Sequence, residues 1–147
     1  MNTKVTVEVF QEINSEHQEL ERQYAAFDTF LSGELVRVPS LRRRLSEFAV
    51  ILKCHFDHEE EGGYFREIVE MAPRLSRVAQ ELESEHDELL GRLEYLADQL
   101  STTADVAREF AQLHKATTEF IAACRAHEHR ETALMQEAWF TEIGTGD

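Results

Sequence analysis

Residues 106–134 read VAREFAQLHKATTEFIAACRAHEHRETAL, a stretch that contains both a helical pattern and the polar residues that interrupt it. Alternating steps of three and four residues connect Val106, Phe110, Leu113, Thr117, Phe120, Cys124, His127, Glu131 and Leu134. This spacing is typical of a helix that packs one apolar face against its neighbours at a shallow angle. His127 and Glu131 are four residues apart on that face, so we expect them to be neighbours inside an apolar interface.

Three earlier stretches have the same spacing, which predicts an all-α protein with four helices. Their face positions are Phe10, Ile13, His17, Leu20, Tyr24, Phe27 and Leu31, then Leu41, Leu45, Phe48, Leu52, His55 and Glu59, then Leu75, Ala79, Leu82, His86, Leu89, Leu93, Leu96 and Leu100. We expect helices over residues 6–32, 39–71, 73–100 and 104–137, in a single domain of residues 1–147 with a short C-terminal tail. Short connections make neighbouring helices antiparallel, so the sequence predicts an up-down-up-down four-helix bundle.

The expected helix ends coincide with residues that start or interrupt helices. Pro39 and Pro73 suit the first turns of the second and third helices. Gly62-Gly63 weakens the second helix, where we expect a kink or a new start over Tyr64 to Met71. Residues 101–105, Ser-Thr-Thr-Ala-Asp, offer several N-cap candidates for the fourth helix.

Composition and charge exclude several classes of function. The 147 residues include two prolines and six glycines, which favours long helices over a β fold. A formal charge of −14 argues against binding to nucleic acid or to an anionic membrane surface, because both need basic patches. No apolar run approaches the ~20 residues of a transmembrane helix, and the N-terminus lacks the apolar core of a signal peptide. Cys54 and Cys124 form no CxxC motif, so we expect two reduced thiols in a cytoplasmic protein.

Six polar residues occupy positions on the apolar faces: His17, His55, Glu59, His86, His127 and Glu131. A buried carboxylate without a partner costs several kcal/mol, so two of them beside four imidazoles make little sense in a dry core. One histidine on an apolar face is usually a hydrogen-bonded core residue, but six donors on four helices predict a site for two metal ions. The remaining histidines, His58, His114 and His129, are off the faces and are expected at the surface.

Most of the six residues are equidistant from the turn between their helices, as residues at equal height in an antiparallel pair must be. His86 and His127 are the exception. Their midpoint is near residue 106, whereas the expected turn is centred near residue 103. This difference predicts an axial misfit of roughly 10 Å between the two side chains.

The pattern resembles that of the hemerythrin-like family, also called HHE cation-binding domains. The resemblance covers the whole chain and rests on four motifs: Glu16-His17, His55…Glu59, Glu85-His86 and His127…Glu131. It implies one iron on His17 and His55 and a second iron on His86 and His127. It also implies that Glu59 and Glu131 bridge the two irons, usually with an oxo or hydroxo group, although Mn or Zn suits the same donors.

The chain departs from the oxygen-carrying hemerythrins, which have a fifth histidine one turn from another on the third helix. Leu82, Leu89 and Leu90 stand at the positions one turn from His86 and cannot ligate a metal. Six ligands over two irons leave more open positions than reversible oxygen carriage uses. The candidates for an extra ligand are Glu21, Glu83, Glu128 and above all His58, which a modest helix rotation would turn inward.

A ferritin-like site is excluded, because it needs a second ExxH motif besides Glu83-x-x-His86. Asn14, Leu52 and Cys124 stand where the other glutamates would be. Tyr24 could donate a hydrogen bond to a bound oxygen species, and Cys124 could be a redox-sensitive neighbour of the metal. Core packing is the simpler explanation for both residues.

These residues leave the function at the level of a class. We expect a di-iron protein that senses or handles a small diatomic or peroxide ligand (O₂, NO or peroxide) or responds to iron itself, with enzymatic turnover undecided. The alternatives are an interaction module that iron orders for a protein partner or a second copy, an iron-buffering protein, and a metal-free structural bundle.

Overall fold

The structure, a computed structural model, describes residues 3–33, 36–102 and 107–145, with side chains described through residue 140 except at residues 3, 107 and 108. Within these ranges the chain is all helical, as the sequence predicts, and contains no strand. The elements are α1 (Thr3–Leu31), α2 (Val38–Glu61), α3 (Tyr64–Met71), a short 3-10 helix η1 (Pro73–Leu75), α4 (Ser76–Thr102) and α5 (Ala107–Thr145). None of the described helices is long and apolar enough to cross a membrane.

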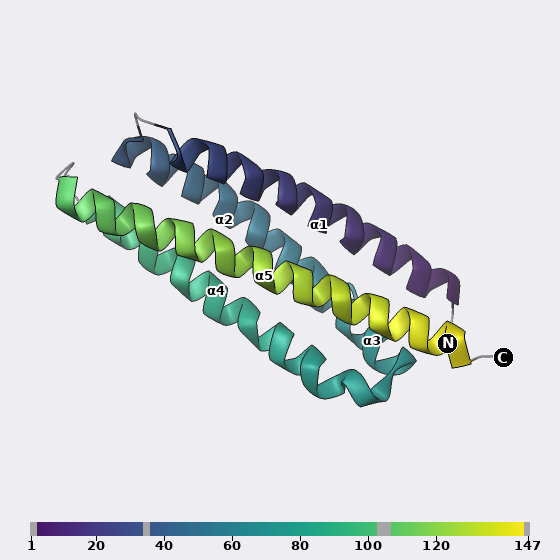
Figure 1. Cartoon of the computed structure of the whole chain (residues 1–147). Coiled ribbons are helices and arrows are strands. Elements are labelled where there is room, and N and C mark those ends of the chain that lie inside the picture. Colours follow the sequence, from purple (N-terminus) through teal and green to yellow (C-terminus); the bar gives the residue numbers. More distant parts are fainter. Residues whose placement is uncertain (1–2, 34–35, 103–106, 146–147) are drawn as a thin grey trace.

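The four long helices, α1, α2, α4 and α5, lie side by side, and α3 lies at the end of the bundle where α4 begins (Figure 1). α1 and α5 are antiparallel, because residues late in α1 contact an earlier part of α5 than residues near the start of α1 do. Asp28 meets Arg125 at 3.0 Å toward one end, and the rings of Phe10 and Trp139 meet at 6.2 Å toward the other. The start of α1 and the end of α5 therefore lie at the same end of the bundle (Figure 1).

The region expected to form the second helix is divided into α2 and α3 by a turn at Gly62-Gly63. Gly63 has a φ of 88°, a left-handed conformation that a residue with a Cβ rarely adopts. The new start expected at Tyr64 is confirmed, because α3 begins there. Tyr64, Phe65 and Ile68 of α3 are buried, so this short helix closes the end of the core.

Several of the expected helix ends are wrong. α4 begins at Ser76 because Pro73 opens a 3-10 turn, and it continues to Thr102. α5 is described from Ala107, so its expected start at residue 104 lies outside the described residues, and it continues to Thr145 instead of ending at residue 137 in a tail. It continues because its apolar face does: Ala138 is fully buried and Trp139 packs on the ring of Phe10. Outside the described residues lie the cap candidates Thr103, Ala104 and Asp105 and the face residue Val106.

The apolar core consists of two clusters with a polar layer between them. One cluster, which includes Leu20 and Phe48, lies toward the connection between α1 and α2. The other, which includes Ile13 and Leu134, lies toward α3. His17 comes between Ile13 and Leu20 along α1, so its side chain enters the bundle between the two clusters. The fold thus surrounds the polar layer with apolar side chains at both ends.

Candidate metal centre

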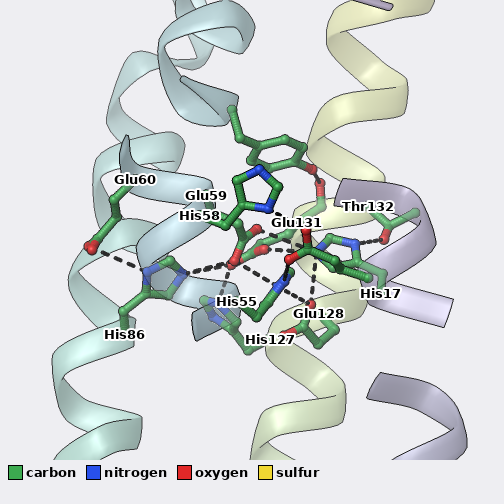
Figure 2. A network of polar contacts seen from close by, with 12 residues as sticks. His17, His55, His58, Glu59, Glu60, His86, His127, Glu128, Glu131 and Thr132 are labelled. Atoms are coloured by element: carbon green, nitrogen blue, oxygen red, sulfur yellow. Dashed lines mark hydrogen bonds and ion pairs between the residues drawn. The ribbon is translucent and has the colours of Figure 1, made fainter. Parts of the chain in front are cut away.

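The six face residues lie together in this polar layer, and all of them are buried (Figure 2). Each of the four long helices contributes a histidine, and α2 and α5 each add the glutamate four residues further on. We call His17 and His55 the α1–α2 pair, and His86 and His127 the α4–α5 pair. In both pairs the ring centroids are 5.0 Å apart.

The α1–α2 pair directs its Nε2 atoms at two shared carboxylates. Nε2 of His55 lies 2.9 Å from Oε1 of Glu59. Nε2 of His17 lies 3.4 Å from Oε2 of the same glutamate and 3.2 Å from Oε2 of Glu131. One histidine therefore contacts a carboxylate from each half of the chain.

The α4–α5 pair approaches the same two carboxylates from the other side. Nε2 of His86 lies 3.0 Å from Oε1 of Glu131 and 3.5 Å from Oε1 of Glu59, and Nε2 of His127 contacts Glu131. Glu59 and Glu131 each contact histidines of both pairs. The roughly 10 Å misfit expected between His86 and His127 is wrong, because their ring centroids are 5.0 Å apart. α4 continues two residues past its expected end at residue 100, and the connection to α5 lies outside the described residues.

Glutamates outside the layer accept hydrogen bonds from the Nδ1 atoms of two of the four histidines. Nδ1 of His55 donates a hydrogen bond to Glu16 (2.8 Å), and Nδ1 of His127 donates one to Glu85 (2.7 Å). A carboxylate that accepts from Nδ1 fixes the tautomer and leaves the Nε2 lone pair free to bind a metal. The sequence motifs contain both glutamates, but their partners on the neighbouring helix become visible only in the fold.

The side chain of Glu128 is the member of this cluster that the six face positions miss. It is 3% exposed, and its Oε2 lies 2.9 Å from Nε2 of His17 and 3.5 Å from Nε2 of His55. His58, the favoured extra ligand, is instead 42% exposed and contacts Glu16 on the outside of the bundle. The hypothesis that His58 turns inward is therefore not supported by its position.

Many of the buried polar atoms in the layer have no hydrogen-bond partner among the described residues, although oppositely charged atoms lie close by. They include Nε2 of His55 and His127, Oε1 of Glu59, Oε2 of Glu131 and both carboxylate oxygens of Glu128. Atoms of this kind are costly to bury unless a cation satisfies them.

The donor atoms gather into two groups, each with all its atoms within 4.8 Å of one another. One group is His17, His55, Glu128 and Glu131, and the other is His86, His127 and Glu131. Imidazole nitrogens and carboxylate oxygens suit Fe, Mn or Zn. The residues present therefore fit a pair of metal ions that share Glu131.

A comparison with known families agrees with this geometry. The family model described as "Hemerythrin HHE cation binding domain" matches residues 8–139 of the 147-residue chain. The chain belongs to the hemerythrin family. The matched residues include all six face residues, Glu128 and both carboxylates that hold Nδ1 atoms. The searches for similar curated proteins and for similar solved structures found no match.

In the polar layer of this hemerythrin-family chain, the pKa values indicate which histidines and glutamates carry protons when no metal is bound. Burial favours the neutral imidazole, but contacts with buried glutamates outweigh it and raise the pKa of His17 to about 11. The same causes, with Glu16 added, raise the pKa of His55 to about 12. Burial lowers the pKa of His86 to about 4, and burial beside Glu59 raises the pKa of Glu131 well above its usual range. Metal ions that bind here must displace protons from the α1–α2 pair.

Two tyrosines lie near the hemerythrin centre. Tyr64 donates a hydrogen bond from its hydroxyl to the backbone oxygen of Glu131 (2.9 Å), which ties α3 to α5 at the centre. Tyr24 is fully buried, and burial near Glu128 raises the pKa of its hydroxyl. Burial likewise raises the pKa of the Cys124 thiol, which is therefore a core side chain and a poor nucleophile.

Proposed function

We propose that this hemerythrin-family domain holds two iron ions between its four long helices, arranged as an up-down-up-down bundle. The α1–α2 pair would bind one ion and the α4–α5 pair the other, with Glu59 and Glu131 bridging them. The observation that carries the proposal is that each of these carboxylates contacts histidines of both pairs. A shared carboxylate stabilises two neighbouring cations that would otherwise repel each other.

Iron bound in this way, when reduced and with open positions, binds O₂, peroxide or NO. We infer that the protein senses or handles one of these small molecules in the cytoplasm, where its two unpaired cysteines would stay reduced. The chain itself orients the imidazoles through Glu16 and Glu85 and excludes bulk water through the two apolar clusters. Both effects protect a reactive centre from side reactions.

The second candidate is a module whose bundle is ordered by metal and then recognised by a protein partner, or that simply stores iron. Its support is the place of the polar layer in the middle of the bundle, where unpaired buried atoms would oppose folding without a cation. This candidate needs no reaction at the metal.

Reaction of the loaded protein with the three small molecules separates these candidates. Iron-loaded, reduced protein would be mixed with O₂, hydrogen peroxide or NO under anaerobic control, and its visible absorption recorded. We expect a spectral change with at least one of them, absent from Glu59→Ala and retained in His129→Ala, whose side chain is 68% exposed. No change with any of the three would contradict the sensing or handling role and favour the metal-ordered module.

A further inference from the structure

The two halves of the centre repeat one arrangement. In α1, the glutamate before His17 accepts a hydrogen bond from Nδ1 of His55 at 2.8 Å. In α4, the glutamate before His86 accepts one from Nδ1 of His127 at 2.7 Å. The ring centroids in the two pairs are both 5.0 Å apart. The α1–α2 half and the α4–α5 half are therefore related by an approximate internal two-fold axis.

The repeat extends to the residues around the two pairs. Glu16 also contacts His58, three residues after the α2 histidine. Glu85 also contacts Arg130, three residues after the α5 histidine. These corresponding positions both hold a basic side chain on the outside of the bundle, which accounts for the outward position of His58.

The Nδ1 atoms of His17 and His86 also have corresponding neighbours, each the residue after a glutamate of the other half. Nδ1 of His17 lies 3.0 Å from Oγ1 of Thr132, the residue after Glu131. Nδ1 of His86 lies 3.5 Å from Oε1 of Glu60, the residue after Glu59. Figure 2 shows both contacts on opposite sides of the layer.

One inward position breaks the repeat. The residue after the α2 histidine is Phe56, whose ring stacks on His86 with centroids 3.9 Å apart and planes 5° apart. The same ring makes a T-shaped contact with His127, with centroids 5.7 Å apart. The residue after the α5 histidine is Glu128, whose carboxylate meets the α1–α2 pair. Corresponding sites thus present a phenyl ring to one histidine pair and a carboxylate to the other.

We propose that Glu128 is a further ligand of the metal held by the α1–α2 pair, and that the two metal positions are inequivalent for this reason. The inference rests on the proposed di-metal centre and adds to it. Both carboxylate oxygens of Glu128 are buried and have no hydrogen-bond partner among the described residues, and Oε2 lies 2.9 Å from Nε2 of His17. A buried carboxylate beside two imidazole nitrogens is placed to share the metal ion that those nitrogens bind.

Charge balance favours the same assignment. Two divalent cations carry four positive charges, and the two shared carboxylates supply two negative ones. Glu128 reduces the excess by half within a layer enclosed by apolar clusters, where uncompensated charge is expensive. The α1–α2 position therefore binds its metal more tightly than the α4–α5 position.

Among the described residues, none supplies a corresponding carboxylate to the α4–α5 pair. Phe56 and Phe65 cover His86, and Leu82, one turn before it on α4, is fully buried in an apolar cluster. A metal held by the α4–α5 pair would therefore have fewer protein ligands than one held by the α1–α2 pair.

The test is a titration of metal-free protein with Co²⁺, an ion whose visible absorption weakens as its coordination number rises. The wild-type chain is expected to bind two equivalents in two steps, with dissociation constants that differ by at least about tenfold. The tighter step should give the weaker absorption per ion. In Glu128→Gln the tight step should weaken by at least about tenfold, at the lower end of what a lost metal-site partner costs. Its absorption per ion should rise.

His129→Ala is the matched control, because His129 follows Glu128 on α5 but its side chain is 68% exposed, and both steps should stay as in the wild type. Glu128→Asp keeps the charge and retracts the carboxylate by one methylene, and it serves if the Gln variant does not fold. Unchanged affinities and absorption in the Glu128 variants, with two Co²⁺ still bound, would overturn this inference alone. A wild-type chain that binds fewer than two Co²⁺ would overturn the proposed di-metal centre as well.

Discussion

The imidazoles of His17, His55 and His127 are each held at both ring nitrogens, by carboxylates of the polar layer at Nε2 and by a side chain of another helix at Nδ1. Glu16 and Glu85 are the clearest of these outer partners, since each accepts a short hydrogen bond from a histidine on the next helix. Hydrogen bonding to the histidines lowers the pKa of both carboxyls, although partial burial acts in the opposite direction. The outer partners therefore remain charged, which increases the basicity of the imidazole nitrogens that enter the polar layer.

Removing one outer partner tests this role at the scale of a single residue. Glu85→Gln should lower metal affinity about 10- to 100-fold without removing a ligand, because the imidazole of His127 loses its orientation and basicity. Affinity would be measured by competition with a chelator. Glu19→Gln is the control, because Glu19 is exposed on α1 and pairs with Arg22. Equal affinity in wild type and Glu85→Gln would contradict the role.

Protons on the α1–α2 pair predict how metal binding depends on pH. The pKa of His17 is raised to about 11 and that of His55 to about 12, so both are protonated at neutral pH when no metal is present. Metal binding needs neutral imidazoles, so apparent affinity should rise with pH by about tenfold per unit for each proton displaced. Zn²⁺ competition at about pH 6, 7 and 8 measures this slope. An affinity that is constant over that range would contradict the proton-sharing account.

The periodicity of the sequence was sufficient to select the six face residues, because each lies on an apolar face with steps of three and four residues. As an extra metal ligand, the sequence favoured His58 over Glu128, although both lie off these faces. Comparing the two HxxxE stretches resolves the choice. Phe56 follows His55 and Glu128 follows His127, so these two residues occupy corresponding positions. Phe56 is apolar and belongs inside, which predicts that Glu128 lies inside too. His58 and Arg130 also correspond, three residues after each histidine, and the charged Arg130 predicts that both lie outside.

At the scale of elements, the turn between α2 and α3 sets where α3 can cover the centre. Gly63 has a φ of 88°, and a Cβ there would lie 2.5 Å from Nη2 of Arg66. The change Gly63→Ala should therefore lower the free energy of unfolding by about 1–2 kcal/mol, the cost of a left-handed residue with a side chain. Urea denaturation monitored by circular dichroism measures it.

Gly91 provides the matched control for that change. It lies within α4, and a Cβ there would meet nothing within 4 Å. Gly91→Ala should raise the free energy of unfolding by about 0.5–1 kcal/mol, because alanine loses less backbone entropy in a helix. The account of the turn fails if Gly63→Ala is as stable as the wild type while Gly91→Ala behaves as expected.

Element boundaries could be predicted only where the local sequence decides them. Gly62-Gly63 divides α2 from α3 because a left-handed turn needs glycine, and the sequence shows the pair. The length of α5 depends on a distant contact, since the ring of Trp139 packs on Phe10 of α1. A contact between residues so far apart in the chain gives no local signal, so the end at residue 137 was wrong.

At the scale of the whole molecule, a polar layer divides the core into two apolar clusters. The two apolar clusters stabilise both ends of the bundle. In the middle, buried polar atoms that have no hydrogen-bond partner in the described part of the chain oppose folding. Bound metal satisfies these atoms and should raise the free energy of unfolding by RT ln(1 + [metal]/Kd), about 2.7 kcal/mol at a hundred times Kd. Denaturation with and without excess metal measures the increase. Identical unfolding curves would mean that the layer is stable without a cation.

The count of metal ions per chain is the measurement that tests the central claim most directly. Protein expressed with added iron would be analysed by inductively coupled plasma mass spectrometry against its concentration. We expect about two iron ions per chain, because Glu59 and Glu131 are each shared by two histidine pairs. Less than about a tenth of an equivalent of any metal, even after reconstitution, would contradict the account and make the polar layer a proton-sharing core.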